Sequence, residues 1–187
     1  MLLLLLLGLA LSRDACVTPA QCDTLRQAAA RWKPAIGDAY NDADAVEPRL
    51  WLGNVCAAHN QSWLAAHNIT LILCVAREWL APCSAGGTST QYWELDDSTG
   101  EDAAYTARLF DAAANALAQA LHNQEAVLVH CNMGISRSTG VVLAYLMRHR
   151  GLSYDAALAH VRTVRATARP NRLFERLLRA PRQRPEL

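Results

Sequence analysis

Several features are scarce or missing in this sequence, and each absence narrows the class of protein. Lys33 is the only lysine among 18 basic residues and the net charge is +1, so the overall charge points to neither nucleic acid nor a membrane surface. The six cysteines form no CxxC pair, which argues against the common zinc and thioredoxin-like motifs. The longest apolar run has about a dozen residues, fewer than the ~20 of a membrane-spanning helix. No internal repeat is present, which excludes a solenoid.

What remains is the composition of a folded domain with a substantial core. Of the 187 residues, 52% are hydrophobic and 19% are charged, as in ordinary globular chains. We expect one domain over residues 47–180. An extension over residues 1–46, with a leader-like segment and a short helix from Pro19 to Trp32, precedes it, and a polar tail over residues 181–187 follows it.

The first residues, MLLLLLLGLALSRDAC, are similar to the apolar segment of a signal peptide. No basic residue precedes the leucines, however, so a membrane-associating segment through residues 1–12 is an open alternative. Asn60-Gln61-Ser62 and Asn68-Ile69-Thr70 match the acceptor pattern for N-linked glycans. Such triplets arise often by chance, so they do not decide the location.

Apolar and amphipathic segments alternate along the rest of the chain. Strands are predicted at RLWLGN (49–54), ITLILCVA (69–76), QYWEL (91–95) and AVLVH (126–130), and a polar loop at GDAYNDADAVEP (37–48). Helices are predicted over residues 62–68, 102–121, 137–148, 153–163 and 171–178. This alternation predicts an α/β fold with a central, mostly parallel sheet of about four or five strands, flanked by helices on both faces.

Three cysteines, Cys56, Cys74 and Cys131, lie in or beside these apolar segments. Buried free thiols are usually found in such settings. We therefore expect the core to be reduced.

The segment HCNMGISRS (130–138) carries the chemistry. It follows an apolar strand and leads into a helix that begins near Arg137. Backbone N–H groups of such a loop point inward and the helix N-terminus adds partial positive charge, so the loop is predicted to bind an anion. At its mouth Cys131 is predicted to be a thiolate nucleophile, because helix N-termini and cations favour that form.

The residues around Cys131 suit the same chemistry. The planar guanidinium of Arg137 is predicted to bind two phosphate oxygens at once. The hydroxyl of Ser138 is predicted to hydrogen-bond the sulfur and help it leave. His130 is predicted to lock the loop by hydrogen bonds, because an ionised thiol needs no general base.

HCNMGISRS resembles the signature of the Cys-dependent protein tyrosine phosphatases, and within them of the dual-specificity group: His-Cys, five residues, Arg, then Ser or Thr. Four further segments are similar to family motifs in the same order, namely PRLWLGN (48–54), NITLILCVARE (68–78), AYLM (144–147) and RATARPNRLF (165–174). The resemblance covers residues 47–178 and implies a protein tyrosine phosphatase-like fold.

The resemblance also implies a two-step reaction without metal or cofactor. Cys131 attacks phosphorus to form a cysteinyl-phosphate, which water then hydrolyses. The phosphate is held by the side chain of Arg137 and by loop N–H groups. The loop residues implied in substrate binding are Asn132, Met133, Gly134, Ile135, Ser136 and Arg137.

The resemblance further implies a general acid in the segment YWELDDSTGED (92–102). Asp97 is the first choice, Asp96 is its rival and Asp102 is a more distant alternative. Near the end of the chain, Arg165 and the pair Pro170-Asn171 are expected to hold the last helices together.

Phosphorylated proteins are the implied partners, through phosphotyrosine and phosphoserine or phosphothreonine, and no nucleic acid partner is expected. A monomer is expected. The reduced nucleophile favours the cytoplasm, with a secretory or membrane-associated location through residues 1–12 as the alternative. Cys74 is either a packing residue or the partner of Cys131 in a reversible protective disulfide.

Two other functions stay open. One is a phospho-binding scaffold without turnover, although such a binder needs no nucleophile. The other keeps the chemistry but acts on RNA 5′-phosphates or phosphoinositides. From Arg162 onward the chain has eight arginines against Glu175 and Glu186, which would suit an acidic partner.

Overall fold

The computed structural model describes residues 17–30, 41–76, 87–97 and 102–180 of the chain. Five strands form one sheet in the order β1-β2-β5-β3-β4. Among these described strands, β1 pairs antiparallel with β2, and every other pairing is parallel. The strands are β1 (Ala43–Glu47), β2 (Leu50–Gly53), β3 (Leu71–Cys74), β4 (Ser89–Tyr92) and β5 (Val127–His130). The predicted α/β fold with a mostly parallel sheet is confirmed.

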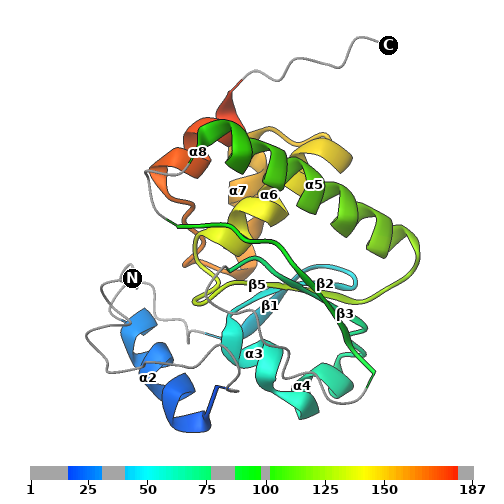
Figure 1. Cartoon of the computed structure of the whole chain (residues 1–187), viewed down its shortest axis with the longest axis vertical. Helices are drawn as coiled ribbons and strands as arrows, with labels where there is room; N and C mark the ends of the chain where they lie inside the picture. Colours follow the sequence, from blue (N-terminus) through cyan, green and yellow to red (C-terminus); the bar gives the residue numbers. More distant parts are fainter. Residues whose placement is uncertain (1–16, 31–40, 77–86, 98–101, 181–187) are drawn as a thin grey trace.

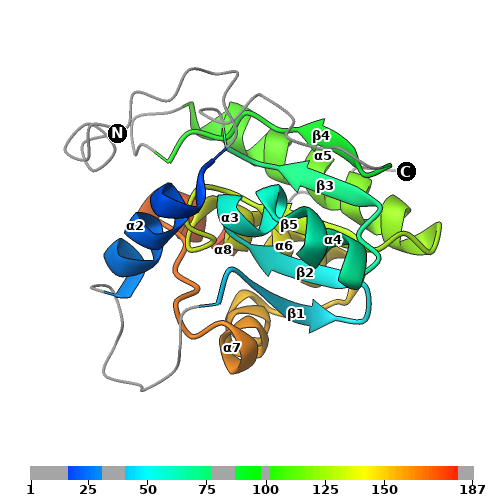
Figure 2. The same ribbon diagram turned by 90° about the horizontal axis from the view of Figure 1, so that it is seen from below.

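Helices cover both faces of the sheet (Figures 1 and 2). In Figure 1, α5, α6, α7 and α8 lie above the sheet and α3 and α4 lie below it, with α2 beside α3. The helices are α2 (Pro19–Ala30), α3 (Val55–His59), α4 (Gln61–Ala66), α5 (Ala103–His122), α6 (Arg137–His149), α7 (Tyr154–Val164) and α8 (Arg172–Arg179). The last four agree closely with the predicted helices.

The central strands are apolar throughout because helices cover them on both sides. All four residues of β5 are buried. Val127 and Val129 pack in the larger apolar cluster with residues of α5 and α6, whereas Leu128 packs in a second cluster with Leu64 and Ile72.

Close packing of α5 against α6 fixes the helix that carries the predicted anion loop. A Cβ atom at Gly140 of α6 would lie 2.7 Å from a ring carbon of Phe110 on α5. The missing side chain therefore lets the two helices approach. The ring of Phe110 in turn meets that of Phe174 on α8 edge-to-face, with 5.0 Å between centroids.

The prediction of a polar loop over residues 37–48 is wrong for residues 43–47, which form β1. This strand lies at the edge of the sheet, and its pairing shifts register between Ala45 and Glu47. Within β1 only Val46 is buried. Its sequence therefore lacks the apolar pattern that predicts a strand.

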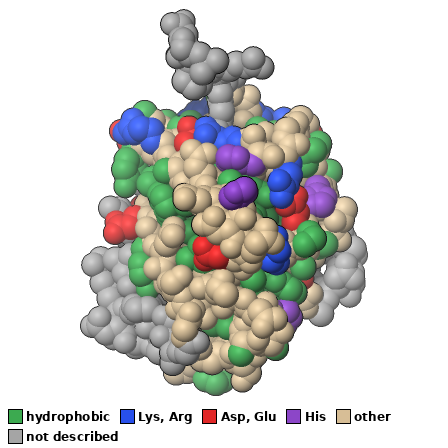
Figure 3. Space-filling model, turned by 90° about the vertical axis from the view of Figure 1, so that its right-hand side faces the viewer, with side chains coloured by type: hydrophobic (Ala, Val, Ile, Leu, Met, Phe, Trp, Pro, Cys, Tyr) green, Lys and Arg blue, Asp and Glu red, His purple; other side chains and the backbone are tan. Residues whose placement is uncertain are grey.

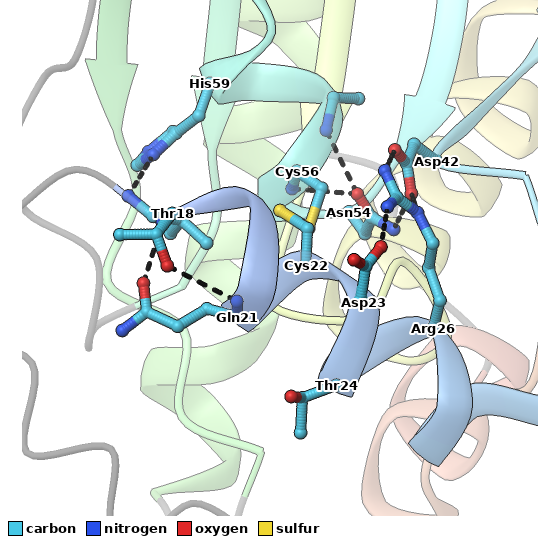
Figure 4. Close-up of a disulfide and its surroundings, with 12 residues drawn as sticks. Thr18, Gln21, Cys22, Asp23, Thr24, Arg26, Asp42, Asn54, Cys56 and His59 are labelled. Carbon is cyan, nitrogen blue, oxygen red and sulfur yellow. Dashed lines mark hydrogen bonds and ion pairs between the residues drawn. A yellow bond between two sulfur atoms is a disulfide. The ribbon is translucent and has the colours of Figure 1, made fainter.

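The expectation of a reduced core is wrong for Cys56, which forms a disulfide with Cys22 (Figure 4). The bond joins α2 to α3, with 5.7 Å between the Cα atoms. An apolar setting suits a free thiol and a buried disulfide equally, so the setting alone could not reveal the bond. Cys74 and Cys131 are free thiols, whereas Cys16 and Cys83 lie outside the described residues.

Charges of both signs share the surface. On the face shown in Figure 3, basic, acidic and histidine side chains are interspersed among apolar and neutral ones. No helix in the described part of the chain is long and apolar enough to span a bilayer. The leader-like residues 1–12 are not among those described.

Candidate active site

The candidate site lies at the edge of the sheet where parallel strands end. The last residues of β2 and β3, Gly53 and Cys74, are both aligned with His130 at the end of β5. Cys131 follows directly, and α6 begins at Arg137. Ligands of open α/β sheets bind at this carboxyl edge.

Two donors are directed at the sulfur of Cys131. The backbone N–H of Gly134 donates to Sγ at 3.2 Å, and the hydroxyl oxygen of Ser138 lies 3.2 Å from the same atom. Cys131 is only 3% exposed, and Ser138 is fully buried. A serine hydroxyl and a backbone amide can both donate to a thiolate, so this setting stabilises a negative charge on the sulfur.

The carbonyl groups of the loop are all hydrogen-bonded to backbone or side-chain donors. Each of the five carbonyls from residue 131 to residue 135 has a donor. These donors are Nδ1 of His130 for Cys131 (3.2 Å), N–H of Val55 for Asn132 (3.2 Å), Nη2 of Arg165 for Met133 (3.1 Å), Nε of Arg165 for Gly134 (2.7 Å) and N–H of Arg169 for Ile135 (2.8 Å). With the carbonyls held this way, the loop N–H groups are left to form an anion-binding concavity.

Gly134 is required at the centre of the loop. Its φ is +67°, in the left-handed region that favours glycine. A Cβ atom there would lie 2.5 Å from the carbonyl oxygen of Gly53 and 2.5 Å from Nη2 of Arg165. The loop therefore packs directly on the end of β2 and on one arginine side chain.

Arg165 supports the loop, a role that the sequence did not predict. Arg165 is 2% exposed. Besides the two loop carbonyls, its guanidinium donates to Oδ2 of Asp44 at 2.6 Å and to the carbonyl of Asn41 at 3.2 Å. The planar fork can serve several acceptors at once, as a lysine cannot. No local signal marks this pairing, because Asp44 lies 121 positions away in the segment predicted as a loop.

Arg137 and Asp97 meet beside the loop. Arg137 is 6% exposed and donates a long hydrogen bond from Nη1 to the carbonyl of Leu95, at 3.5 Å. Its Nε lies 4.0 Å from Oδ2 of Asp97. The other oxygen, Oδ1, accepts from the hydroxyl of Ser136 at 2.6 Å and from Nδ2 of Asn171 at 3.0 Å. The carboxylate of Asp97 is thus placed at the loop, with 44% of its side chain exposed.

The other two acidic candidates are placed differently. Asp102 is the N-cap of α5, where its Oδ1 accepts from the backbone N–H groups of Ala104 and Tyr105. This capping role accounts for Asp102 without any part in the reaction. Asp96 is half-buried next to Asp97.

The start of α6 stays open to an anion. Ser136 is its N-cap residue, yet its side chain caps no N–H group of the helix. Its hydroxyl instead donates to Asp97 and accepts from the N–H of Asn171, at 3.1 Å. The N–H groups of the first turn therefore remain for a ligand, as at other phosphate-binding helix N-termini.

Cys74 forms no disulfide and is buried on the strand next to that of Cys131. On its other side it is aligned with Tyr92 of β4. Burial, and secondarily the charge of Cys74, raise the pKa of Tyr92. The reversible disulfide between Cys74 and Cys131 stays a prediction.

A cysteine held by amide and hydroxyl donors between a buried strand and a helix N-terminus, with an arginine and an aspartate beside it, defines the class of Cys-dependent phosphatases. A family model of the dual specificity phosphatase catalytic domain matches residues 50–184. The chain belongs to this family, which confirms the resemblance inferred from the sequence and, with it, the prediction of a protein phosphatase.

Individual relatives agree with this assignment. Dual specificity protein phosphatase 1B of Arabidopsis thaliana is 35% identical over 130 residues, which cover 70% of this chain and 75% of that protein. The crystal structure of human DUSP28 matches with a TM-score of 0.67 at 35% identity, and covers 74% of this chain and 90% of the other. A human tyrosine phosphatase-like serine/threonine/tyrosine-interacting protein matches with a TM-score of 0.66 at 29% identity, covering 73% and 92%.

Proposed function

We propose that this protein hydrolyses phosphotyrosine and phosphoserine or phosphothreonine in phosphorylated proteins, acting as a monomer through a cysteinyl-phosphate. The observation that carries the proposal is the sulfur of Cys131, which receives the N–H of Gly134 inside a loop whose carbonyls are bonded elsewhere. A loop of this kind binds a tetrahedral dianion and presents a nucleophile to it.

In the first step the thiolate of Cys131 attacks phosphorus and the bond to the leaving oxygen breaks. Asp97 gives that oxygen a proton. Arg137 and the loop N–H groups stabilise the equatorial oxygens as charge builds up on them. Ser136 and Asn171 hold the carboxylate of Asp97 in place for this transfer.

In the second step water attacks the phosphocysteine and the sulfur–phosphorus bond breaks. Asp97, now ionised, takes the proton from the water. The hydroxyl of Ser138, 3.2 Å from the sulfur, donates to the departing thiolate. The enzyme returns to its starting state with phosphate released.

Replacing the nucleophile tests this mechanism. With the Cys131→Ser variant we expect no phosphate release from an aryl phosphate or from phosphopeptides, because a serine hydroxyl without a base is not ionised. Wild-type turnover by the variant would rule out the cysteinyl-phosphate. Binding of phosphopeptides by a wild-type protein that releases no phosphate would favour the scaffold, a possibility raised by the relative named as an interacting protein.

Replacing the acid tests the assignment of Asp97. Asp97→Asn keeps one oxygen that can accept from both Ser136 and Asn171, but it has no carboxyl proton to transfer. Turnover of phosphoserine peptides, which have a poor leaving group, should fall by about 10²–10⁴-fold, and turnover of an activated aryl phosphate should fall much less. Asp96→Asn is the matched control, and a larger fall in that variant would move the role to Asp96. A panel with RNA 5′-phosphates and phosphoinositides checks the substrate class.

A reduced nucleophile favours a cytoplasmic enzyme, with a secretory or membrane-associated location through residues 1–12 as the alternative. The Cys22–Cys56 disulfide supports the alternative, because disulfides persist mainly in oxidising compartments.

A further inference from the structure

The Cys22–Cys56 disulfide lies outside the catalytic machinery. Noncovalent bonds flank the disulfide, one from the residues just before α2 and one from α2 itself (Figure 4). The backbone N–H of Val17 donates to Nδ1 of His59 at 2.8 Å, and Nη2 of Arg26 lies 2.5 Å from Oδ2 of Asp42. The bonded cysteines are 7% and 3% exposed. A buried disulfide in a docked interface is structural and indicates an oxidising compartment.

We propose that the chain matures in a compartment that forms disulfides and attaches N-linked glycans, and that Asn68 is the glycan acceptor. The sequon Asn68-Ile69-Thr70, which had no weight by itself, becomes informative beside the disulfide. The apolar run before the described residues is similar to a secretory leader, which agrees with this location.

Both covalent steps use reactants of such a compartment. Disulfide formation removes two electrons and two protons from the thiols of Cys22 and Cys56, and an oxidised dithiol carrier protein takes them up. In the second step Nδ2 of Asn68 bonds to the anomeric carbon of an oligosaccharide attached to a lipid pyrophosphate. The anomeric C–O bond breaks, the lipid pyrophosphate leaves, and the amide loses one proton.

Asn68 presents its side chain in a fixed turn. It is exposed, lies between α4 and β3, and has a φ of +52°. Its backbone N–H donates to the carbonyl of Ala65 at 3.1 Å, and the next residue, Ile69, is only 5% exposed. Within the described ranges its side chain makes no hydrogen bond. The folded domain therefore accommodates a bulky group on this side chain without losing a contact.

A glycan on Asn68 would leave the active site accessible. β3 begins at Leu71, shortly after Asn68, and runs parallel to β5. The start of β3 is aligned with Val127 and its end with His130, next to the catalytic loop. Asn68 therefore lies at the opposite edge of the sheet from Cys131.

Asn60 offers a matched comparison. It is also exposed and belongs to a sequon, but its Oδ1 accepts from the backbone N–H of Trp63 as the N-cap of α4. Asn60→Asp removes this sequon and keeps the cap, because aspartate is as good an N-cap as asparagine. Asn68→Asp likewise tolerates a positive φ. Neither variant touches the catalytic loop.

The experiment expresses the full chain and these variants in cultured eukaryotic cells. Peptide N-glycosidase should increase the gel mobility of the wild type, and Asn68→Asp should lose one glycosidase-sensitive shift completely. Asn60→Asp and Thr70→Ser, which keeps the Asn68 sequon, should retain that shift. Peptide mapping after alkylation without reductant should recover Cys22 and Cys56 as one cross-linked pair.

Three results would overturn the proposal: a wild type without any glycosidase-sensitive shift, a shift that Asn68→Asp leaves unchanged, or alkylated Cys22 and Cys56 in the freshly isolated chain. None of these measurements depends on phosphatase activity, so the location and the proposed function can fail separately.

Discussion

The catalytic loop is supported differently on its two sides. On the side of α7 and α8, Arg165 and the backbone of Arg169 bind three consecutive carbonyls of the loop. On the side of α3, the N–H of Val55 binds the carbonyl of Asn132. The residue after Val55 is Cys56, whose disulfide attaches α3 to α2.

The difference separates two kinds of support. The first consists of charged and peptide hydrogen bonds that form whenever the chain folds. The second includes a covalent bond that exists only after oxidation. We infer that the α7–α8 side determines the shape of the loop, and that the disulfide side mainly adds stability by restricting the unfolded chain.

The largest effect is expected on the first side. Arg165→Met removes the hydrogen-bond donors of two loop carbonyls, and it leaves the buried carboxylate of Asp44 without its arginine partner. Breaking a buried ion pair costs about 3–5 kcal/mol, and a loop displaced by ~1 Å loses about 100-fold in turnover. Urea unfolding and kcat on an aryl phosphate measure the two effects.

Arg169→Met is the control for this variant. The side chain of Arg169 is exposed and its backbone N–H makes the contact with the loop, so the substitution should change little. Arg165→Lys should recover part of the stability through Asp44 but little turnover, because a lysine cannot serve both carbonyls. Wild-type turnover in Arg165→Met would show that the loop keeps its shape without this support.

The next effect concerns the disulfide side. The double variant Cys22→Ser, Cys56→Ser removes a cross-link between residues 34 positions apart. A closed loop of this length corresponds to roughly 3–4 kcal/mol of unfolding free energy. Turnover should change far less than in Arg165→Met. The measurement is urea unfolding with and without reductant.

Reductant should lower the stability of the wild type to that of the double variant and leave the double variant unchanged. An equal fall in both would assign the effect to other cysteines. A loss of turnover as large as that of Arg165→Met would show instead that the disulfide shapes the loop.

Local patterns explain which parts of this molecule were predictable. β5, β3 and α5 were predicted because their apolar residues follow the period of a buried strand or an amphipathic helix. The loop from Cys131 to Ser138 was predicted because its chemistry is contiguous in the sequence. β1 was missed because an edge strand with one buried residue shows no such period.

Long-range pairings explain what was not predictable. The partners Arg165 and Asp44, and Cys22 and Cys56, lie 121 and 34 positions apart, and nothing in their local sequence connects them. Asn171 was expected to hold the last helices, and it does cap α8 through the N–H of Phe174. Its second contact, with Asp97, depends on the tertiary fold.

The smallest effect tests this double role of Asn171. Serine is an equally good N-cap, so Asn171→Ser should change the unfolding free energy by less than ~0.5 kcal/mol. It removes the Nδ2 donor that lies 3.0 Å from Oδ1 of Asp97. A hydrogen bond worth about 1 kcal/mol in the transition state corresponds to roughly a fivefold fall in kcat on phosphoserine peptides.

Asn171→Asp sharpens the same test, because aspartate keeps the cap but places a second negative charge beside Asp97. That charge should favour the protonated, proton-donating form of Asp97, so the fall of kcat/KM on the basic side of the pH–rate profile should move to higher pH. Asn171→Ser should leave this profile nearly unshifted. If both variants keep the wild-type profile and the wild-type kcat on phosphoserine peptides, Asn171 acts only as a helix cap, and the orientation of Asp97 depends on Ser136 alone.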